Sequence, residues 1–181
     1  MISREEALKF VHENIDTESL INHMLSVEAV MRSLAKKFGE DEELWGITGL
    51  VHDVDLGRTR DNLDRHGLEG AEMLEGKLPP EALQAIRAHP GILPRETKID
   101  WALYFGDPIT GLITAGAYMR PSRSVVDMEL KSLKKKFKDK RFAAGVNRDQ
   151  IRACSELGLE LDEFLQLALD AMKGIHSDIG L

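Results

Sequence analysis

The clearest feature of the chain is a run of apolar residues at steps of three and four between positions 20 and 38. Residues at this spacing line one face of an α-helix, so the run predicts an amphipathic helix over 20–38. Gly39 follows where a helix commonly ends in a left-handed residue. His23 lies on the flank of the same face, so we expect its imidazole to point into the protein. The face is made by Leu20, Met24, Val27, Met31, Leu34 and Phe38.

The rest of the chain repeats this helical pattern and shows no convincing alternation of apolar and polar residues, which would be typical of a strand. A capping box at Ser3 and Glu6 predicts a first helix that runs to about Asn14. Residues 55–65 are expected to form a polar loop. We predict further helices over 41–54, 66–77, 81–88 and 99–118, and two more within 148–175.

These elements predict an all-α fold, a helical bundle with a C-terminal helical extension. We expect one domain over residues 1–181, with a bundle core over about 20–120 and a basic, helical C-terminal part over about 121–181. Gly46 and Gly49 interrupt the helix predicted over 41–54, and glycine costs about 1 kcal/mol in a helix relative to alanine. We therefore expect close helix packing at these two positions.

The composition is that of a globular protein, with 43% apolar and 30% charged residues. The formal net charge of −7 argues against general binding to duplex nucleic acid, although a local basic patch could still meet an anion. One cysteine, Cys154, excludes an internal disulfide and fits a reducing compartment. Neither a signal segment nor a membrane-spanning run is found, so we expect a cytoplasmic protein without membrane contact.

Histidine and aspartate residues form a second pattern. His52 and Asp53 are adjacent at the end of an apolar run, and an imidazole beside a carboxylate suits borderline divalent metals. Asp107 interrupts the apolar segment 99–118, where an isolated buried carboxylate is costly without a cation. His23 taken alone would be read as a core residue, as a lone histidine on an apolar face usually is. The full set comprises His23, His52, Asp53, His66, His89 and Asp107.

The order His…His-Asp…His…His…Asp resembles the HD-domain superfamily of metal-dependent phosphohydrolases, in the form with a two-metal site. The resemblance covers residues 20–120, and six residues in this order outweigh the reading of each histidine as a core residue. Relatives usually have alanine before the last aspartate, where this chain has Gly106. The resemblance implies that Asp53 bridges two metals, the first completed by His23, His52 and Asp107 and the second by His66 and His89.

The resemblance also implies a cofactor and a reaction. We expect one or two divalent ions per chain, with iron or manganese as the leading metals and zinc, nickel, cobalt or magnesium as the alternatives. Iron or manganese is favoured over magnesium because magnesium prefers all-oxygen shells, whereas imidazole suits later metals. A metal-activated hydroxide would cleave a phosphoester or phosphoanhydride of a small phosphorylated compound, with a nucleotide as the leading class. Asp53, His52 and Asp107 would be the catalytic residues. Asp55 stays open between a proton donor for the leaving group and the cap of a loop.

The segment 131–141 carries seven lysines and arginines. A solvated helix face is the simplest explanation, and Lys134 and Lys138 at i, i+4 fit it. The alternative is a phosphate-attracting rim over the active site of an acidic protein. We take Arg123, Lys134 and Lys135 as the phosphate-binding candidates, with Arg58, Arg60, Arg87 and Arg120 as rivals.

Two classes of function follow from these patterns. The first is the phosphohydrolase, and the second is a non-catalytic ligand-binding or interaction protein that contains metal. The complete ligand set argues against the second class, because a site that no longer catalyses a reaction would be free to lose ligands. We expect a small phosphorylated partner, and neither duplex nucleic acid nor a membrane. The sequence leaves the oligomeric state open, with a homodimer as one option.

Overall fold

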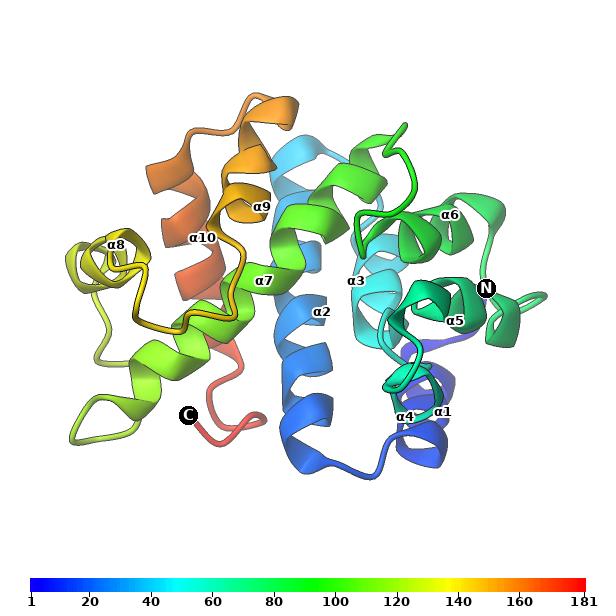
Figure 1. Cartoon of the computed structure of the whole chain (residues 1–181), viewed down its shortest axis with the longest axis horizontal. Helices are drawn as coiled ribbons and strands as arrows, with labels where there is room; N and C mark the ends of the chain where they lie inside the picture. Colours follow the sequence, from blue (N-terminus) through cyan, green and yellow to red (C-terminus); the bar gives the residue numbers. More distant parts are fainter.

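The computed structural model describes residues 1–181, and all of its regular elements are helices, which confirms the predicted all-α fold. The long helices α2 (Glu18–Phe38) and α7 (Lys98–Tyr118) cross the middle of the molecule (Figure 1). On one side lie α3 (Glu42–Val51) and α6 (Pro80–Ala88), and on the other α10 (Leu161–Gly174). The other elements are α1 (Arg4–Asn14), α4 (Leu56–Thr59), α5 (Leu68–Met73), α8 (Leu130–Lys138), α9 (Arg148–Arg152) and two 3₁₀ turns, Leu63–Arg65 and Ala153–Leu157.

Helix α2 forms where the apolar spacing predicts it. Its apolar face is buried, and Met24, Met31 and Leu34 are fully inaccessible to solvent. Gly39 ends the helix with a φ of +70°, and its N–H donates to the carbonyl oxygen of Ala35. The predicted capping box at the start of α1 forms as well. Local sequence therefore sets the beginning of α1 and the end of α2.

Two helices are shorter than predicted, and one predicted loop contains a helix. Helix α3 ends at Val51 because the chain turns at His52, which places Asp53 beyond the regular hydrogen bonding of the helix. Helix α5 ends at Met73, and Gly76 follows in the left-handed region with a φ of +73°. The polar segment after α3 contains the short helix α4. The early end of α3 matters most, because it leaves the His-Asp pair free to face neighbouring helices.

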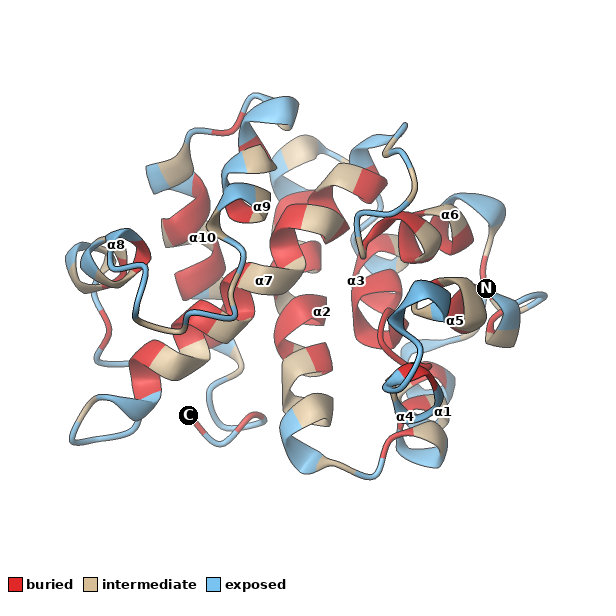
Figure 2. Cartoon of the chain, viewed as in Figure 1, coloured by how far each residue is buried: buried red, intermediate tan, exposed pale blue.

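One continuous hydrophobic core joins the N-terminal and C-terminal helices. Figure 2 shows buried residues along α2, α3, α7 and α10. Phe105 on α7 and Phe164 on α10 meet edge to face, with ring centroids 4.9 Å apart. The C-terminal helices thus pack on the same two central helices as the N-terminal ones. None of the helices has both the length and the apolar character needed to span a lipid bilayer.

Gly49 allows α3 to approach α2 closely, as the sequence predicts. A Cβ atom at this position would lie 2.9 Å from Cγ of Met31 and 3.0 Å from the carbonyl oxygen of Val27. A backbone atom cannot move aside without moving its helix, so a side chain here would push α2 and α3 apart. Gly106 on α7 differs, because a Cβ there would meet its nearest atoms at an ordinary 3.6 Å.

We predict opposite effects for the same substitution at these two glycines. Gly49→Ala should destabilise the fold, because overpacking costs about 1–3 kcal/mol and exceeds the gain of about 1 kcal/mol in helix propensity. Gly106→Ala should stabilise the fold by up to about 1 kcal/mol, since it gains propensity without a clash. Urea denaturation of both variants measures the two changes. Equal stability of the variants would show that the approach of α2 to α3 does not depend on Gly49.

Candidate metal centre

The C-terminal end of α3 orients His52. This residue is the C-cap, and the last carbonyl groups of a helix lack partners within it. Nδ1 of His52 lies 2.8 Å from the carbonyl oxygen of Gly49. A proton on Nδ1 makes this hydrogen bond and leaves a lone pair on Nε2. Nε2 itself is buried and has no hydrogen-bond partner.

Helix α6 repeats this arrangement at His89. This residue is also a C-cap, and its Nδ1 lies 2.7 Å from the carbonyl oxygen of Ile86, three residues earlier. In both helices an unpaired carbonyl of the last turn holds the imidazole. The C-terminal end of a helix carries partial negative charge, so two such ends favour a cation near them.

His66 is held by a carboxylate instead of a carbonyl group. Its Nδ1 lies 2.9 Å from Oδ1 of Asp55, while Oδ2 of Asp55 accepts hydrogen bonds from the backbone N–H groups of Gly67 and Gly70. Asp55 is completely buried. Both of its oxygens are therefore used within the protein, which leaves none to protonate a leaving group. Asp55 positions His66 and ties it to the start of α5.

His23 joins α2 to α7. Its Nδ1 lies 3.0 Å from the hydroxyl oxygen of Thr110, whose own proton is donated to the carbonyl oxygen of Asp107 at 2.8 Å. The hydroxyl oxygen is thus available to accept the proton on Nδ1. Nε2 of His23 lies 3.1 Å from Oδ1 of Asp107. The same pair of residues on α7 therefore fixes both ends of the ring.

The Nε2 atoms of all four histidines converge on the carboxylate of Asp53, which is 5% exposed. Oδ1 lies 3.2 Å from His52, 3.3 Å from His89 and 3.4 Å from His66. Oδ2 lies 3.5 Å from His23. The structure thus brings together all six predicted metal ligands. We call them the His–Asp cluster, which comprises His23, His52, Asp53, His66, His89 and Asp107.

The spacing of the His–Asp cluster suits divalent ions. Ligand atoms about 2.1 Å from one ion lie about 3.0–3.4 Å apart in octahedral and tetrahedral shells. The nitrogen–oxygen distances above are close to this range, and the Nε2 atoms of His66 and His89 are 3.1 Å apart. A cation would also give the buried, unpaired Nε2 of His52 a partner. The residues present therefore fit a metal.

The donor atoms form two overlapping sets, and within each set all of the atoms lie within 4.8 Å of one another. His23, His52 and Asp107 form one set, and His52, Asp53 and His89 form the other. His52 belongs to both sets, whereas the family resemblance implies Asp53 as the shared ligand. The two oxygens of Asp53 face different histidines, as a bridging carboxylate requires.

Without a metal, protons balance the two carboxylates. Burial lowers the pKa of His23, but hydrogen bonds to Asp107 and Asp53 outweigh it and raise this pKa to about 10. Burial also lowers the pKa of His66, but hydrogen bonds to Asp53 and Asp55 outweigh it and raise this pKa to about 10. Burial lowers the pKa of His52 to about 4, so this ring stays neutral. A cation at the cluster would displace the protons of His23 and His66, so metal binding should release protons.

The structure places the phosphate-binding candidates away from the His–Asp cluster. In Figure 1, α8 lies on one side of α7, and α3 and α6 lie on the other. Lys134 on α8 pairs with Asp162 on α10, whereas Lys135 is exposed and has no acidic partner. Arg123 is exposed in the loop after α7, with a φ of +53°. No hydrogen bond or ion pair joins any of the three to the cluster.

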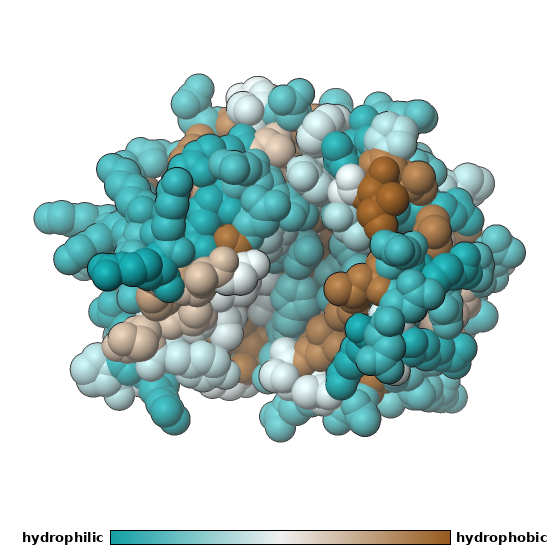
Figure 3. Space-filling model, in the orientation of Figure 1, coloured by the Kyte–Doolittle hydropathy of each residue, from teal (hydrophilic) through white to brown (hydrophobic).

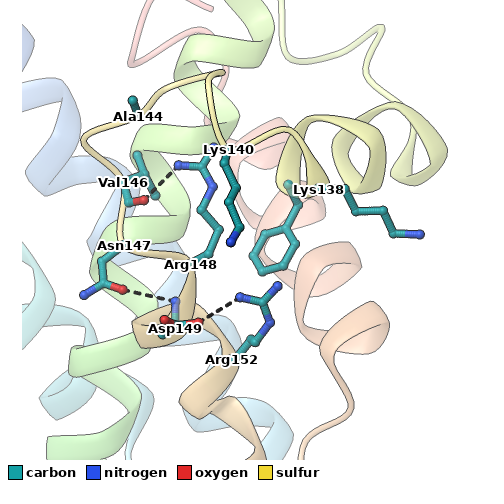
Figure 4. Close-up of a pocket in the computed structure, with 9 residues that line it drawn as sticks. Lys138, Lys140, Ala144, Val146, Asn147, Arg148, Asp149 and Arg152 are labelled. Atoms are coloured by element: carbon teal, nitrogen blue, oxygen red, sulfur yellow. Dashed lines mark hydrogen bonds and ion pairs between the residues drawn. The ribbon is translucent and has the colours of Figure 1, made fainter.

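Basic residues line a separate cavity of about 530 Å³ beside α8, shown in Figure 4. Arg148 donates to backbone carbonyl groups of the loop between α8 and α9. Arg152 pairs with Asp149 and lies over the ring of Phe137. These two arginines are thus used to hold the loop and α9. The cavity contains no residue of the His–Asp cluster.

Thr110 was not among the residues predicted for the site, and the role of Asp55 was open from the sequence. Both are polar residues that the structure buries, at 1% and 0% exposure. A usable signal exists for each, because Thr110 follows Asp107 by three residues on an apolar helix and Asp55 follows Asp53 by two. Their hydrogen-bond partners could not be predicted from the sequence. The partner of Thr110 is His23 on another helix, and the partner of Asp55 is His66, eleven residues further along the chain.

We predict that Asp55→Asn weakens metal binding at the His66 and His89 end by about 10–100-fold, the usual effect of losing a residue that orients a ligand. The amide has the size of the carboxylate but loses the charge that holds His66. Titration with Mn²⁺ by calorimetry measures the affinities. Asp61→Asn, which changes an exposed carboxylate of the same segment, is the control and should leave the affinities unchanged. Identical titrations of both variants would contradict the role given to Asp55.

Comparison with known proteins agrees with this geometry. A search of curated proteins finds no match. Among solved structures, the chain is similar to a 1.50 Å crystal structure of a predicted HD superfamily hydrolase involved in NAD metabolism from Clostridium acetobutylicum. The two are 19% identical with a TM-score of 0.54 over 94% of this chain and 98% of that chain, a likeness of fold.

The family comparison is more specific. The model of the HD domain matches residues 20–132, which is more than half of the chain. All six residues of the His–Asp cluster lie inside the matched range. The family model thus covers the four histidines and two aspartates that the fold brings together, and the chain belongs to the HD domain family.

Proposed function

We propose that the protein is a metal-dependent phosphohydrolase that cleaves a phosphoester or phosphoanhydride bond of a small phosphorylated compound, a nucleotide. One observation carries the proposal. Each of the four imidazoles of the His–Asp cluster has its Nδ1 within 3.0 Å of an oxygen atom, and its Nε2 faces a carboxylate. This arrangement presents Nε2 lone pairs at one point, which the packing of core histidines does not require.

We assign two metal positions that share Asp53. His23, His52 and Asp107 would complete the first, and His66 and His89 the second. When bound, the ions supply positive charge opposite a phosphoryl group and a water nucleophile that is active near neutral pH. Iron or manganese is the expected metal, because four imidazoles are poor ligands for magnesium.

Asp53, His52 and Asp107 are the residues we propose as catalytic, and their exposure separates their roles. His52 is fully enclosed and neutral, so it serves as a fixed ligand. Asp53 is also enclosed and shares its two oxygens among the histidines. The side chain of Asp107 is 25% exposed, as is that of His23. Substrate would therefore approach from the side of these two residues.

A nucleotide is the substrate class that we propose. The family and the cluster support a phosphorylated compound, and the similar protein from Clostridium acetobutylicum is described as involved in NAD metabolism. We propose the cytoplasm as the compartment, because the chain's single thiol, Cys154, is free and buried. The rival function is a non-catalytic protein that keeps its metal for ligand binding or interaction, and only turnover separates the two.

The function predicts turnover that depends on metal. Protein loaded with Mn²⁺ should bind up to two ions per chain and hydrolyse at least one member of a panel of nucleotides or a generic phosphoester, and chelation should abolish the activity. Elemental analysis and phosphate release measure the two quantities. Asp53→Ala should lose both metal and activity, because it removes the shared ligand. Metal-loaded protein that is inactive on the whole panel would favour the non-catalytic rival.

We also propose Arg123, Lys134 and Lys135 as candidates for binding phosphate. Lys135 is the candidate we test, because it is exposed and has no acidic partner, whereas Lys134 is paired with Asp162. If Lys135 holds a phosphate of the substrate other than the one at the cluster, Lys135→Ala should keep the metal and lower kcat/KM at least tenfold, since a hydrogen bond to a charged group is worth about 1.5–3 kcal/mol. Lys9→Ala, on α1, controls for loss of surface charge. If Lys135→Ala and Lys9→Ala have the same kinetics, Lys135 belongs to a solvated surface and does not bind the substrate.

A further inference from the structure

A groove of about 260 Å³ opens between α2 and α7, and His23 lines it. The groove therefore adjoins the His–Asp cluster at His23. Figure 3 shows that the face of the molecule viewed in Figure 1 is hollowed near its middle, in the region of α2. We infer that this α2–α7 groove binds the nucleoside part of the substrate, with the phosphate at the cluster. The inference rests on the proposed function and adds the place and the chemistry of substrate recognition.

The helix face that carries Asp107 continues along the groove. Gly111, Thr114 and Tyr118 line it and follow Asp107 at steps of four, three and four, which keeps them in one stripe on α7. The stripe is about 16 Å long at a rise of 1.5 Å per residue. A ligand whose phosphate lies at Asp107 would thus have its remaining atoms along these residues.

The C-terminal segment closes the groove with two aliphatic side chains. Ile179 and Leu181 both line it and are only 2% and 8% exposed. The segment is fixed to α2, because the side-chain amide of Asn22 donates to the carbonyl oxygen of Ile179 at 3.3 Å. The backbone N–H of Leu181 also donates to the carbonyl oxygen of His176 at 3.0 Å. The groove therefore has a fixed apolar wall.

Apart from His23, the side chains that line the groove are uncharged. Ser19 on α2 and Thr114 on α7 supply hydroxyl groups, which suit the hydroxyl groups and ring nitrogens of a nucleoside. The hydroxyl of Ser26 donates its proton to the carbonyl oxygen of Asn22 at 2.7 Å. Tyr118 is 54% exposed and offers an aromatic ring on which a base can stack. A second phosphate would find no lysine or arginine here, unlike in the cavity of Figure 4.

The size of the groove fits a part of a ligand. Pockets for complete drug-sized ligands measure about 300–1,000 Å³, and this groove is smaller. It therefore suits one end of a substrate whose other end lies at the His–Asp cluster. A nucleoside suits the observed mixture of hydroxyl, aliphatic and aromatic groups, whereas a lipid chain would offer no partner to the hydroxyl groups of Ser19 and Thr114.

Binding of unphosphorylated nucleosides tests the inference without any hydrolysis. Adenosine, guanosine, cytidine, uridine and thymidine are titrated into Mn²⁺-loaded protein and followed by NMR. We expect at least one to bind with a millimolar or lower Kd. Ala115→Trp, which fills the groove from α7, should weaken this binding at least tenfold while Mn²⁺ binding is kept. Ala144→Trp, at an exposed position outside the groove, should leave it unchanged.

Tyr118→Ala provides a second variant that should fold normally, because the ring is exposed. It should weaken nucleoside binding at least fivefold. The inference is overturned if no nucleoside binds the wild-type protein, or if binding is the same in Ala115→Trp, Tyr118→Ala and wild type. The protein could also bind a nucleoside, with weaker binding in both variants, and yet be inactive on every phosphate ester. This result would contradict the proposed phosphohydrolase function and support the assignment of the groove.

Discussion

The carboxylate of Asp53 is the group on which the arrangement of this protein depends. It is almost completely enclosed, and an enclosed carboxylate is costly unless positive charge or hydrogen-bond donors surround it. Four imidazoles meet this need, from α2, from the ends of α3 and α6, and from the segment before α5. Because these segments are distant in sequence, compensation of one buried charge links much of the N-terminal half. A divalent cation would provide the same compensation without protonating the histidines.

The four histidines are oriented by different kinds of acceptor. Two use carbonyl groups at helix C-termini, His23 uses the hydroxyl of Thr110, and His66 uses the carboxylate of Asp55. A carboxylate partner raises the basicity of the imidazole it binds more than a carbonyl does. His66 should therefore be the strongest electron donor of the four. It belongs to the proposed second metal position, so the two positions would differ in affinity even where their ligand atoms are alike.

Charge is distributed unevenly around this centre. The chain has a net charge of −7, yet residues 130–152 contain nine lysines and arginines and only two aspartates. Part of this positive charge is structural, because Arg148 and Arg152 hold the loop and α9. The exposed lysines of α8 remain able to attract anions over a distance of about a Debye length. The α2–α7 groove has no lysine or arginine in its lining, so attraction of an anion and recognition of its organic part would fall to different surfaces.

Sequence alone was sufficient for the features that depend on residues a few positions apart. The period of apolar residues predicts α2, and a mostly apolar run predicts α7. The caps at Ser3 and Gly39 predict where helices begin and end, because these interactions close within one or two turns. The six ligand candidates were also recognisable, since their residue types and order are written in the chain. The early end of α3 was not, because no glycine or proline marks it in residues 51–56.

Only the tertiary structure decided which polar groups meet. Asp55 could have been a proton donor or a cap until its oxygens were found on His66 and on backbone N–H groups of the following segment. Lys134 could have been free until Asp162 was found beside it, 28 residues later in the chain. The physical reason is the range of the forces. Helix hydrogen bonds and periodicity act over a few residues, whereas the partner of a buried or charged group depends on which helices the hydrophobic core brings together.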